Sequence, residues 1–348
     1  MTTPAITVEV CDPWDDPWWR EALDANPAAN LGQAREWLSV ISSTYSHTPY
    51  YLKAEDSSGH IGVLPAFLVR RPFLGRVMVS MPFLDSGGPC AGSTALSSCL
   101  VEQMIKGAGQ HGATTVELRC TEPTALALPP MTQKVDLVLS LPRDADTMWQ
   151  DLSPKVRNQV RKAQRSGLSI AMGGSELLQE FYSVFSANMR DLGSPVHSRE
   201  FFFQILDHFK TSGTIFLVRR DRTPLGGLMA LSFNGAMYVP WASSLRKYAQ
   251  FCPNMLLYWG IIEHSIKQGF TRFCFGRSTR GSGTYHFKRQ WGAEEMPLYW
   301  YSISLDGRHA GNGSIDSRTW VFLSRLWRTL PVRMSQLLGP PIRRYLTQ

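Results

Sequence analysis

Basic, hydroxyl and aromatic side chains are concentrated in one short stretch of the chain, and their types and spacing suggest a site that binds an anion. The stretch covers residues 273–293 and reads FCFGRSTRGSGTYHFKRQWGA. An apolar run is followed by a glycine-rich turn that carries Arg277 and Ser278, and then by Tyr285 and Lys288. Backbone amides in such a turn, backed by cations, could hold a phosphate or a developing oxyanion. The alternative is an ordinary strand, loop and helix with solvated arginines.

A second group of cations lies on a helix that we expect over residues 153–166. Ser153 followed by a proline is typical of a helix N-terminus. Arg157 and Arg161 are four residues apart and therefore share a helix face. A solvated face is the default interpretation, and a phosphate-binding face is the alternative.

Three ordered motifs resemble those of the FemAB-type transferases, particularly the FemAB-like proteins found with PEP-CTERM/exosortase and exopolysaccharide gene sets. The C-terminal pattern of that family is close to F-x-F-G-R-S-x-x-G-S/T-G-x-Y-x-F-K-x-x-W-G, which residues 273–292 match. The basic segment 152–168 and the sequence PFLDSGGP at residues 82–89 are the other two matches. Three matches in one order are far more specific than a lone short motif.

The resemblance implies an α/β fold with two tandem GNAT-like (acyl-CoA N-acyltransferase-like) domains, in which mixed sheets are flanked by helices. It implies an acyl- or aminoacyltransferase that acts on an amine of a cell-envelope or exopolysaccharide precursor. Members of the peptidoglycan branch transfer an aminoacyl group from aminoacyl-tRNA to an amine of a lipid-linked precursor. Such transfer needs a neutral amine, hydrogen-bond donors for the oxyanion and cations for phosphates. It needs no metal ion and no resident cofactor, because the activated donor is a co-substrate.

The resemblance also suggests roles for individual residues. In the peptidoglycan branch, the lysine of an F-K-x-x-F/W pattern lies near the substrate phosphates, and Lys288 occupies that position. We therefore expect Lys288 to bind phosphate or stabilise charge, and Tyr285 to donate a hydrogen bond to the reacting carbonyl; a surface lysine at the start of a helix and a core tyrosine are the alternatives. The expected site is a cleft between the two domains. His286 and Glu263 are possible general bases, and neither is assigned. The remaining candidates for substrate binding are Arg277, Ser278, Asn254, Arg157, Arg161, Tyr238, Trp241, Gly87 and Gly88.

One departure from the GNAT pattern bears on the donor. A conventional GNAT enzyme holds the pyrophosphate of acyl-CoA with a loop of the form Q/R-x-x-G-x-G/A before a helix. The equivalent segment here, residues 246–254, reads RKYAQFCPN and contains no glycine. This favours aminoacyl-tRNA over acyl-CoA, although an acyl-CoA-dependent N-acetyl- or acyltransferase remains the alternative enzyme. Asn254 would lie near a helix N-terminus, where the dipole favours anions.

The order of expected elements occurs twice along the chain, which indicates duplicated α/β units. In the first half we expect a helix, a hairpin, a third strand before a glycine-bearing loop, a helix and a strand, at residues 34–45, 50–55 with 61–70, 76–83, 94–112 and 115–119. In the second half we expect a three-strand meander, a helix and a strand, at residues 214–220, 225–234, 236–242, 252–269 and 271–275. A strand at residues 134–141 precedes the basic helix. We place the domains at residues 1–133 and 134–312, followed by a C-terminal segment, 313–348.

The amino-acid composition restricts the classes of protein to which the chain can belong. The 348 residues carry a formal net charge of +8, with 43% hydrophobic residues, which is typical of a globular protein with a sizeable core. Six scattered cysteines without C-x-x-C spacing favour reduced thiols over a disulfide frame or a zinc site. No secretory signal and no membrane-spanning run is evident, so we expect a cytoplasmic protein.

Basic residues concentrate in the second half of the chain. Residues 1–150 hold 10 Lys/Arg against 16 Asp/Glu, whereas residues 151–348 hold 26 against 12. This suggests an anionic partner such as a nucleotide-activated donor, a nucleic acid or a membrane surface. The aromatic, arginine-rich stretch 318–346 could lie on an anionic membrane at the inner face or pack on its own domain. A non-catalytic component of an export or polysaccharide assembly that binds anionic lipid or RNA is therefore the alternative of a different class.

Overall fold

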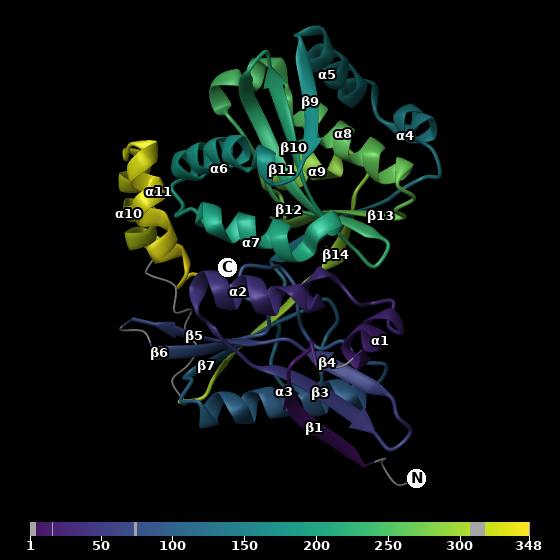
Figure 1. Ribbon diagram of the computed structural model, residues 1–348, viewed down its shortest axis with the longest axis vertical. Coiled ribbons are helices and arrows are strands. Elements are labelled where there is room, and N and C mark those ends of the chain that lie inside the picture. The colour runs from purple at the N-terminus through teal and green to yellow at the C-terminus, as the bar shows by residue number, and fades with distance from the viewer. Residues whose placement is uncertain (1–4, 16, 73–74, 307–316, 348) are drawn as a thin grey trace. The chain divides into compact units, whose positions relative to one another are not determined.

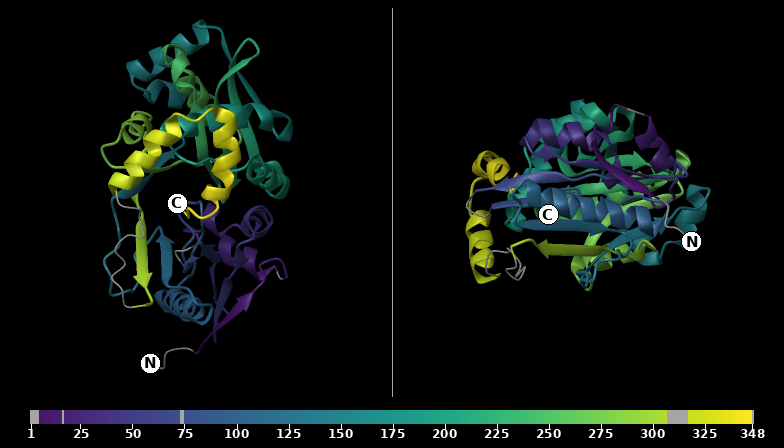
Figure 2. Two further views of the ribbon diagram at one scale, coloured as in Figure 1. Left: turned by 90° about the vertical axis from the view of Figure 1, so that its left-hand side faces the viewer. Right: turned by 90° about the horizontal axis from the view of Figure 1, so that it is seen from below.

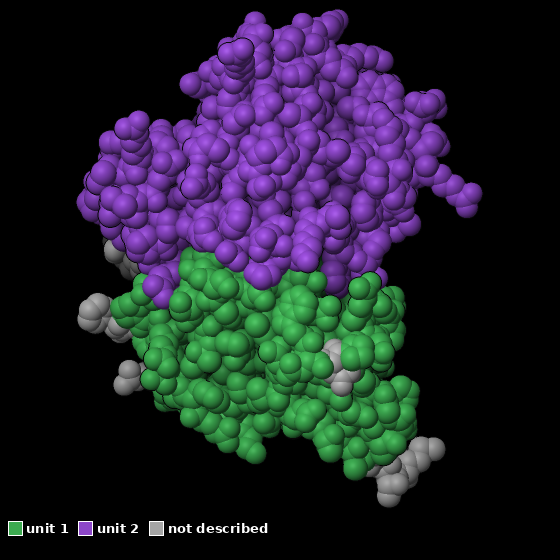
Figure 3. Space-filling view, viewed as in Figure 1, with its two compact units in different colours: residues 1–135, 296–314, 345–348 green, residues 136–295, 315–344 purple. Residues whose placement is uncertain are grey.

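The computed structural model describes residues 5–15, 17–72, 75–306 and 317–347 (Figure 1). The chain divides into two compact units, coloured separately in Figure 3. Unit 1 comprises residues 1–135, 296–314 and 345–348, and unit 2 comprises residues 136–295 and 315–344. These ranges differ from the segments 1–133, 134–312 and 313–348 that we placed from the sequence. The chain returns to unit 1 after Glu295, adds a strand there, and then passes back to unit 2.

The described residues of unit 1 form two sheets. The first has the strand order β1-β3-β4 and the second the order β15-β7-β6-β5-β2. The strands are β1 (Ile6–Cys11), β2 (Thr48–Pro49), β3 (Tyr51–Asp56), β4 (Ile61–Leu64), β5 (Phe67–Arg71), β6 (Gly75–Val79), β7 (Thr115–Cys120) and β15 (Tyr299–Ser304). The helices are α1 (Trp18–Asp24), the 3₁₀ turn η1 (Leu31–Gln33), α2 (Glu36–Tyr45) and α3 (Thr94–Gln110).

The predicted hairpin of unit 1 is correct at its turn and wrong in the length of its second strand. β3 and β4 pair antiparallel. Residues 61–70 form two strands instead of one, because β4 ends before Pro65 and β5 begins after it in the other sheet. Proline has no amide hydrogen to donate to a ladder, so it suits the point where a strand changes sheets.

Helix α3 supplies much of the core of unit 1. Ser93 caps its N-terminus by accepting a hydrogen bond from the amide of Leu96. Leu96, Leu100 and Met104, at helical spacing, are fully buried against the strands. The helix approaches the chain so closely at Gly107 that a Cβ there would come within 2.0 Å of the Tyr50 hydroxyl.

Unit 2 is built on one mixed sheet with the order β14-β8-β13-β12-β11-β10-β9. The strands are β8 (Lys134–Ser140), β9 (Leu168–Gly173), β10 (Gly213–Arg220), β11 (Thr223–Phe233), β12 (Ala236–Ser244), β13 (Arg272–Thr279) and β14 (Glu294–Pro297). The helices are α4 (Ala145–Asp151), α5 (Pro154–Arg165), α6 (Leu178–Leu192), α7 (Arg199–Phe209), α8 (Pro253–Lys267), α9 (Gly283–Arg289), α10 (Ser317–Arg328) and α11 (Val332–Arg343). Three 3₁₀ turns complete the unit, namely η2 (Ser175–Leu177), η3 (Lys210–Ser212) and η4 (Arg246–Phe251).

The predicted meander of unit 2 is confirmed, since β10, β11 and β12 pair antiparallel in sequence order. Helix α6 packs on β10 to β12, and α8 packs on β9 to β12, so helices flank the central strands (Figure 1). The core beneath α6 and α7 is aromatic: Phe201 and Phe202 both meet the Trp241 ring edge to face, with ring centroids 5.4 Å apart. Such contacts add to the burial of the apolar ring surface.

The predicted repeat is also confirmed. In unit 1 the helix α3 joins β6 to β7, and these strands pair in parallel. In unit 2 the helix α8 joins β12 to β13, and these strands again pair in parallel. Each parallel pair follows an antiparallel neighbour, β5 or β11. The five-stranded sheet of unit 1 and the seven-stranded sheet of unit 2 are therefore mixed and flanked by helices, as predicted, whereas the sheet β1-β3-β4 is antiparallel.

Candidate active site

One cavity in unit 2 begins where β12 and β13 stop pairing. The two strands are joined only through Ala236–Tyr238 and Arg272–Cys274, the first three residues of each. β12 continues to Ser244 and β13 to Thr279, and these later residues, all of them described by the structure, do not pair with one another. Ligands of open α/β sheets bind at the carboxyl ends of strands. The ends of β12 and β13, with the start of α8, are such a place.

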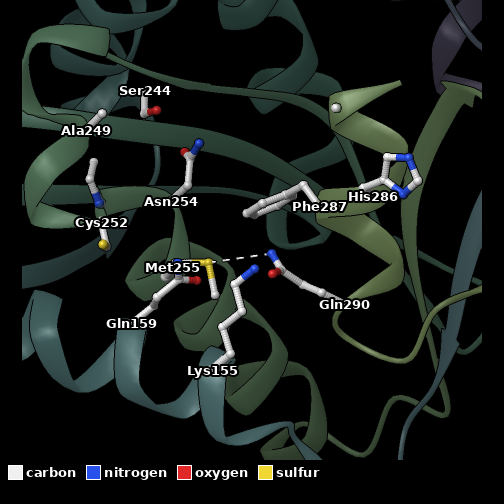
Figure 4. Close-up of a pocket in the computed structure, with 12 residues that line it drawn as sticks. Lys155, Gln159, Ser244, Ala249, Cys252, Asn254, Met255, His286, Phe287 and Gln290 are labelled. Carbon is white, nitrogen blue, oxygen red and sulfur yellow. Dashed lines mark hydrogen bonds between the residues drawn. The ribbon is translucent and has the colours of Figure 1, made fainter. Parts of the chain in front are cut away.

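A cavity of about 440 Å³ lies there (Figure 4). Its walls come from the end of β12, the start of α8, helix α9 and helix α5. The lining residues are Lys155, Gln159, Ser244, Ala249, Cys252, Pro253, Asn254, Met255, Gly283, His286, Phe287 and Gln290. In Figure 4, Phe287 projects towards Asn254, whereas the imidazole of His286 points away from it. The cavity has the size of a small-molecule site.

The chain before α8 offers few free amide donors to this cavity. Residues 246–251 form the turn η4, and the amides of Tyr248, Cys252 and Met255 each donate to the carbonyl three residues earlier at 3.0 Å. Pro253, the first residue of α8, has no amide hydrogen. A glycine-rich diphosphate loop would instead present its amides to the ligand. Side chains must therefore supply most of the polar contacts in this cavity.

Helix α5 brings two of those side chains. Its N-terminus forms as predicted, with the Ser153 hydroxyl accepting from the amide of Val156 at 3.4 Å and proline at the first helical position. Val156 and Val160 are fully buried where α5 packs on α8. The side chains one turn apart on the neighbouring face, Lys155 and Gln159, reach the cavity. In Figure 4 the ammonium of Lys155 points to its interior.

The two arginines predicted on this helix have other contacts. Arg157 donates to the carbonyls of Trp149 and Gln150, at 3.3 and 2.7 Å. The Arg161 guanidinium lies 5.5 Å from the centroid of the Trp149 ring. Both side chains therefore hold α4 against α5, and neither is among the residues that line the cavity.

Lys288 lies in the last turn of α9, not at the start of a helix and not on the surface. Its side chain is buried, and its Nζ donates to the carbonyls of Gly276 and Arg277 at 2.7 and 3.0 Å. Gly276 has a φ of 76°, a left-handed conformation that favours glycine. The ammonium thus holds α9 against the end of β13, which sets the position of the cavity wall formed by Phe287 and Gln290.

Tyr285 belongs to a cluster outside the cavity lining. Its hydroxyl donates to Glu295, and Arg280 donates to the same carboxylate at 2.7 Å. The hydrogen bond with the carboxylate raises the pKa of Tyr285, and the hydrogen bonds from Tyr285 and Arg280 lower the pKa of Glu295. This cluster ties the glycine-rich turn and α9 to β14.

The other predicted residues of unit 2 are dispersed. Asn254 lines the cavity at the start of α8. Trp241 is part of the aromatic core, and Tyr238 lies half-buried on β12. Ser278 is buried on β13, and its hydroxyl has no hydrogen-bond partner within the described part of the chain. Glu263 is paired with Lys267 at 2.8 Å on the outer side of α8.

Gly87 and Gly88 lie in unit 1, in the loop before α3. Their amides donate to the carbonyl of Arg119 at 3.1 and 2.8 Å, so both donors are used within the fold. A smaller cavity of about 210 Å³ lies beside Gly88 at the start of α3. It corresponds in the repeat to the cavity at the start of α8.

The sequence contained signals for some residues that the interpretation missed. Lys155 and Gln159 have the same four-residue spacing as the arginines that drew attention to α5. Phe287 and Gln290 lie within the motif 273–293, but which of its residues face the cavity depends on the helical turn of α9. Cys252, in the left-handed conformation at the N-cap of α8, carries no recognisable motif.

The site region coincides with a family match. Residues 153–289 match the model of the acetyltransferase (GNAT) domain. This range runs from the N-cap of α5 to the end of α9 and includes every cavity-lining residue except Gln290. A search of curated proteins gives no match.

Several solved structures share the fold. FemX aligns with a TM-score of 0.65 at 12% identity, over 86% of this chain and 97% of FemX. L-PGS from Bacillus licheniformis aligns with a TM-score of 0.54 at 13% identity, over 91% and 98% of the two chains. A tandem GNAT protein from the clavulanic acid biosynthesis pathway aligns with 0.53 at 12% identity, over 86% and 98%. The chain thus has a mixed α/β fold of the GNAT type that extends over both units.

Proposed function

We propose that the chain is an N-acyltransferase of the aminoacyl- or acyl-transferring kind, and that unit 2 binds the activated donor in the cavity between β12, α8, α9 and α5. The proposal rests on the position of this cavity. It lies where the parallel strands β12 and β13 separate and at the N-terminus of α8. The match of residues 153–289 to the GNAT domain supports it.

Within this class, the loop geometry favours an aminoacyl donor such as aminoacyl-tRNA over acyl-CoA. The diphosphate of CoA needs several converging donors. The segment before α8 uses the amides of Tyr248, Cys252 and Met255 internally and adds a proline. The side chains of Lys155, Gln159 and Asn254 suit a ligand with one phosphate and several hydroxyl or base groups, which is the chemistry of the 3′ end of tRNA.

The reaction would be attack of a neutral acceptor amine on the carbonyl carbon of the donor ester. The new C–N bond forms as the C–O bond to the ribose breaks, and the proton lost by the amine is gained by the released hydroxyl. Lys155 and Asn254 would bind and orient the donor, and Lys288 would act as a positioning residue through α9. No protein base is assigned, since His286 turns its ring away from Asn254.

The acceptor follows from the FemAB resemblance alone. We propose an amine of a cell-envelope or exopolysaccharide precursor, consistent with the PEP-CTERM-associated proteins that the three motifs resemble. A phosphate-bearing or lipid-linked acceptor fits the basic balance of the second half of the chain.

The test is calorimetric titration of the protein with acetyl-CoA and with a non-hydrolysable 3′-aminoacylamido-adenosine 5′-phosphate. We expect the nucleotide to bind more tightly, and Lys155→Ala and Asn254→Ala each to weaken it roughly fivefold, about 1 kcal/mol. Lys162→Ala is the matched control, because this lysine is exposed on the same helix and does not line the cavity. Tighter binding of acetyl-CoA that depends on Lys155 would make acyl-CoA the donor, and binding of neither compound would overturn the proposal.

A further inference from the structure

Helices α10 and α11 pack on the rest of unit 2 largely through small and polar residues. On α11, Ser335 and Gly339 are buried, and a Cβ at Gly339 would come within 2.9 Å of the backbone nitrogen of Val196. Gln336 donates to the hydroxyl of Ser186 on α6 at 2.8 Å. The packed face of α11 is therefore not its apolar face.

Helix α6 and the loop that follows it hold α10 through hydrogen bonds of the same kind. The Ser324 hydroxyl donates to the carbonyl of Gly193 at 3.1 Å. Arg190 donates to the carbonyl of Leu330, between the two helices, at 2.8 Å. Backbone carbonyls and hydroxyls thus make these contacts, whereas most of the large apolar side chains remain outside.

The opposite faces of both helices are apolar and exposed. Phe322 and Leu326 lie one turn apart on α10 and are 66% and 55% exposed, and Leu337 on α11 is 68% exposed. In the left view of Figure 2 the two helices lie in front, with nothing drawn over their outer side. Eight large apolar residues of these helices are exposed, out of seventeen in the described part of the chain. They are Val321, Phe322, Leu323, Leu326, Met334, Leu337, Leu338 and Ile342.

The charge of this segment has one sign. Residues 317–348 contain six arginines and no aspartate or glutamate. Arg325 is exposed beside Phe322 and Leu326, and Arg333 is exposed beside Met334. An apolar helix face whose own charged residues are all arginines is the pattern of a helix that lies in an anionic membrane interface.

We propose that the outer face of α10 and α11, defined by the eight apolar residues above, binds the surface of an anionic lipid bilayer. Each helix has 12 residues, a length of about 18 Å that suits lying in the interface and cannot cross the hydrocarbon. None of the helices in the described residues is long and apolar enough to span a membrane. A second copy of the chain is a poorer occupant, because a two-fold contact would set the arginines of one copy against those of the other.

The test is co-sedimentation of the full chain with vesicles of phosphatidylcholine alone and of phosphatidylcholine with phosphatidylglycerol. We expect binding to the anionic vesicles to be at least tenfold tighter and to weaken with salt. The double variant Phe322→Glu/Leu337→Glu should lose this binding, and Arg325→Gln/Arg333→Gln should weaken it roughly thirtyfold. Met172→Glu is the control, because Met172 is 53% exposed on β9 of the same unit and lies outside the proposed surface.

Circular dichroism and thermal unfolding establish that each variant is folded. Equal affinity for both kinds of vesicle, or unchanged binding by the double glutamate variant, would overturn the proposal. Light scattering after size exclusion tests the other occupant: a wild-type dimer that the double glutamate variant dissociates would make this face a protein interface and would also overturn it. The proposal is independent of the donor cavity, since none of the substituted residues lines it.

Discussion

Replacing Lys288 by methionine separates a structural role of this residue from direct substrate binding. Methionine keeps most of the apolar stem and removes the ammonium that donates to Gly276 and Arg277 at 2.7 and 3.0 Å. The side chain is only 8% exposed, so water cannot readily replace the lost donor. A hydrogen bond from a charged group is worth about 1.5 kcal/mol at the low end of measured values, so two suggest a loss of roughly 3 kcal/mol. For a unit of this size that lowers the unfolding midpoint by about 6–12 °C.

Differential scanning calorimetry and urea unfolding of the wild type and Lys288→Met measure this loss. Lys162→Met, an exposed lysine on α5, should leave the midpoint within about 1 °C. At a temperature where the Lys288→Met protein is folded, we expect its affinity for the donor analogue to fall less than that of Lys155→Ala. A midpoint equal to that of the wild type would refute the structural role, and a large loss of affinity with unchanged stability would place Lys288 on the ligand.

Three further substitutions test the packing of the two units. His197 is buried and accepts a hydrogen bond from Arg343 at 3.0 Å, and burial followed by the charge of Arg343 lowers its pKa well below the usual value. As the pH falls below about 6.5, the unfolded chain therefore binds a proton at this residue before the folded protein does, which lowers the free energy of unfolding in acid. Between pH 7.5 and 5.5, the His197→Gln variant should lose less stability than the wild type, as measured by urea unfolding. An equal loss would contradict this prediction. Gly107→Ala should destabilise unit 1 by about 1–3 kcal/mol through its clash with Tyr50. Gly109→Ala, with no atom within 4 Å of the added Cβ, should instead stabilise it by about 0.5–1 kcal/mol, and similar midpoints for the two alanine variants would contradict the predicted clash.

Sequence patterns correctly predicted the elements that are determined by residues close together in the chain. The alternation of residues 214–242 and the turns between them gave the β10–β12 meander, and the Ser153–proline pair gave the start of α5. The repeat of strands, helix and parallel strand was visible because each copy keeps the same order. Helices α6 and α7 were missed, although apolar residues at helical spacing, including Phe181 and Phe185, were present.

The candidate site depended on long-range contacts, which the sequence pattern does not contain. The face of α5 that reaches the cavity is set by the burial of Val156 and Val160 against α8, and this turned Lys155 inward and left Arg157 on α4. Lys288 looked like a free cation because nothing in its neighbours shows that the carbonyl of Gly276 would meet it. Asn254 was placed correctly at the start of α8, since a proline at the first helical position marks that end.

The pairing of β15 with β7 has a consequence for the synthesis of the chain. β7 lies next to β6 on one side, and its other side is covered by β15, which comes from the far side of unit 2 in the sequence. When unit 1 leaves the ribosome, the edge of β7 therefore has open amides and carbonyls until the whole of residues 136–295 has followed. An open strand edge is a template for pairing with other chains. Expression of residues 1–135 alone would leave that edge permanently open, so we expect this fragment to aggregate more readily than the full chain.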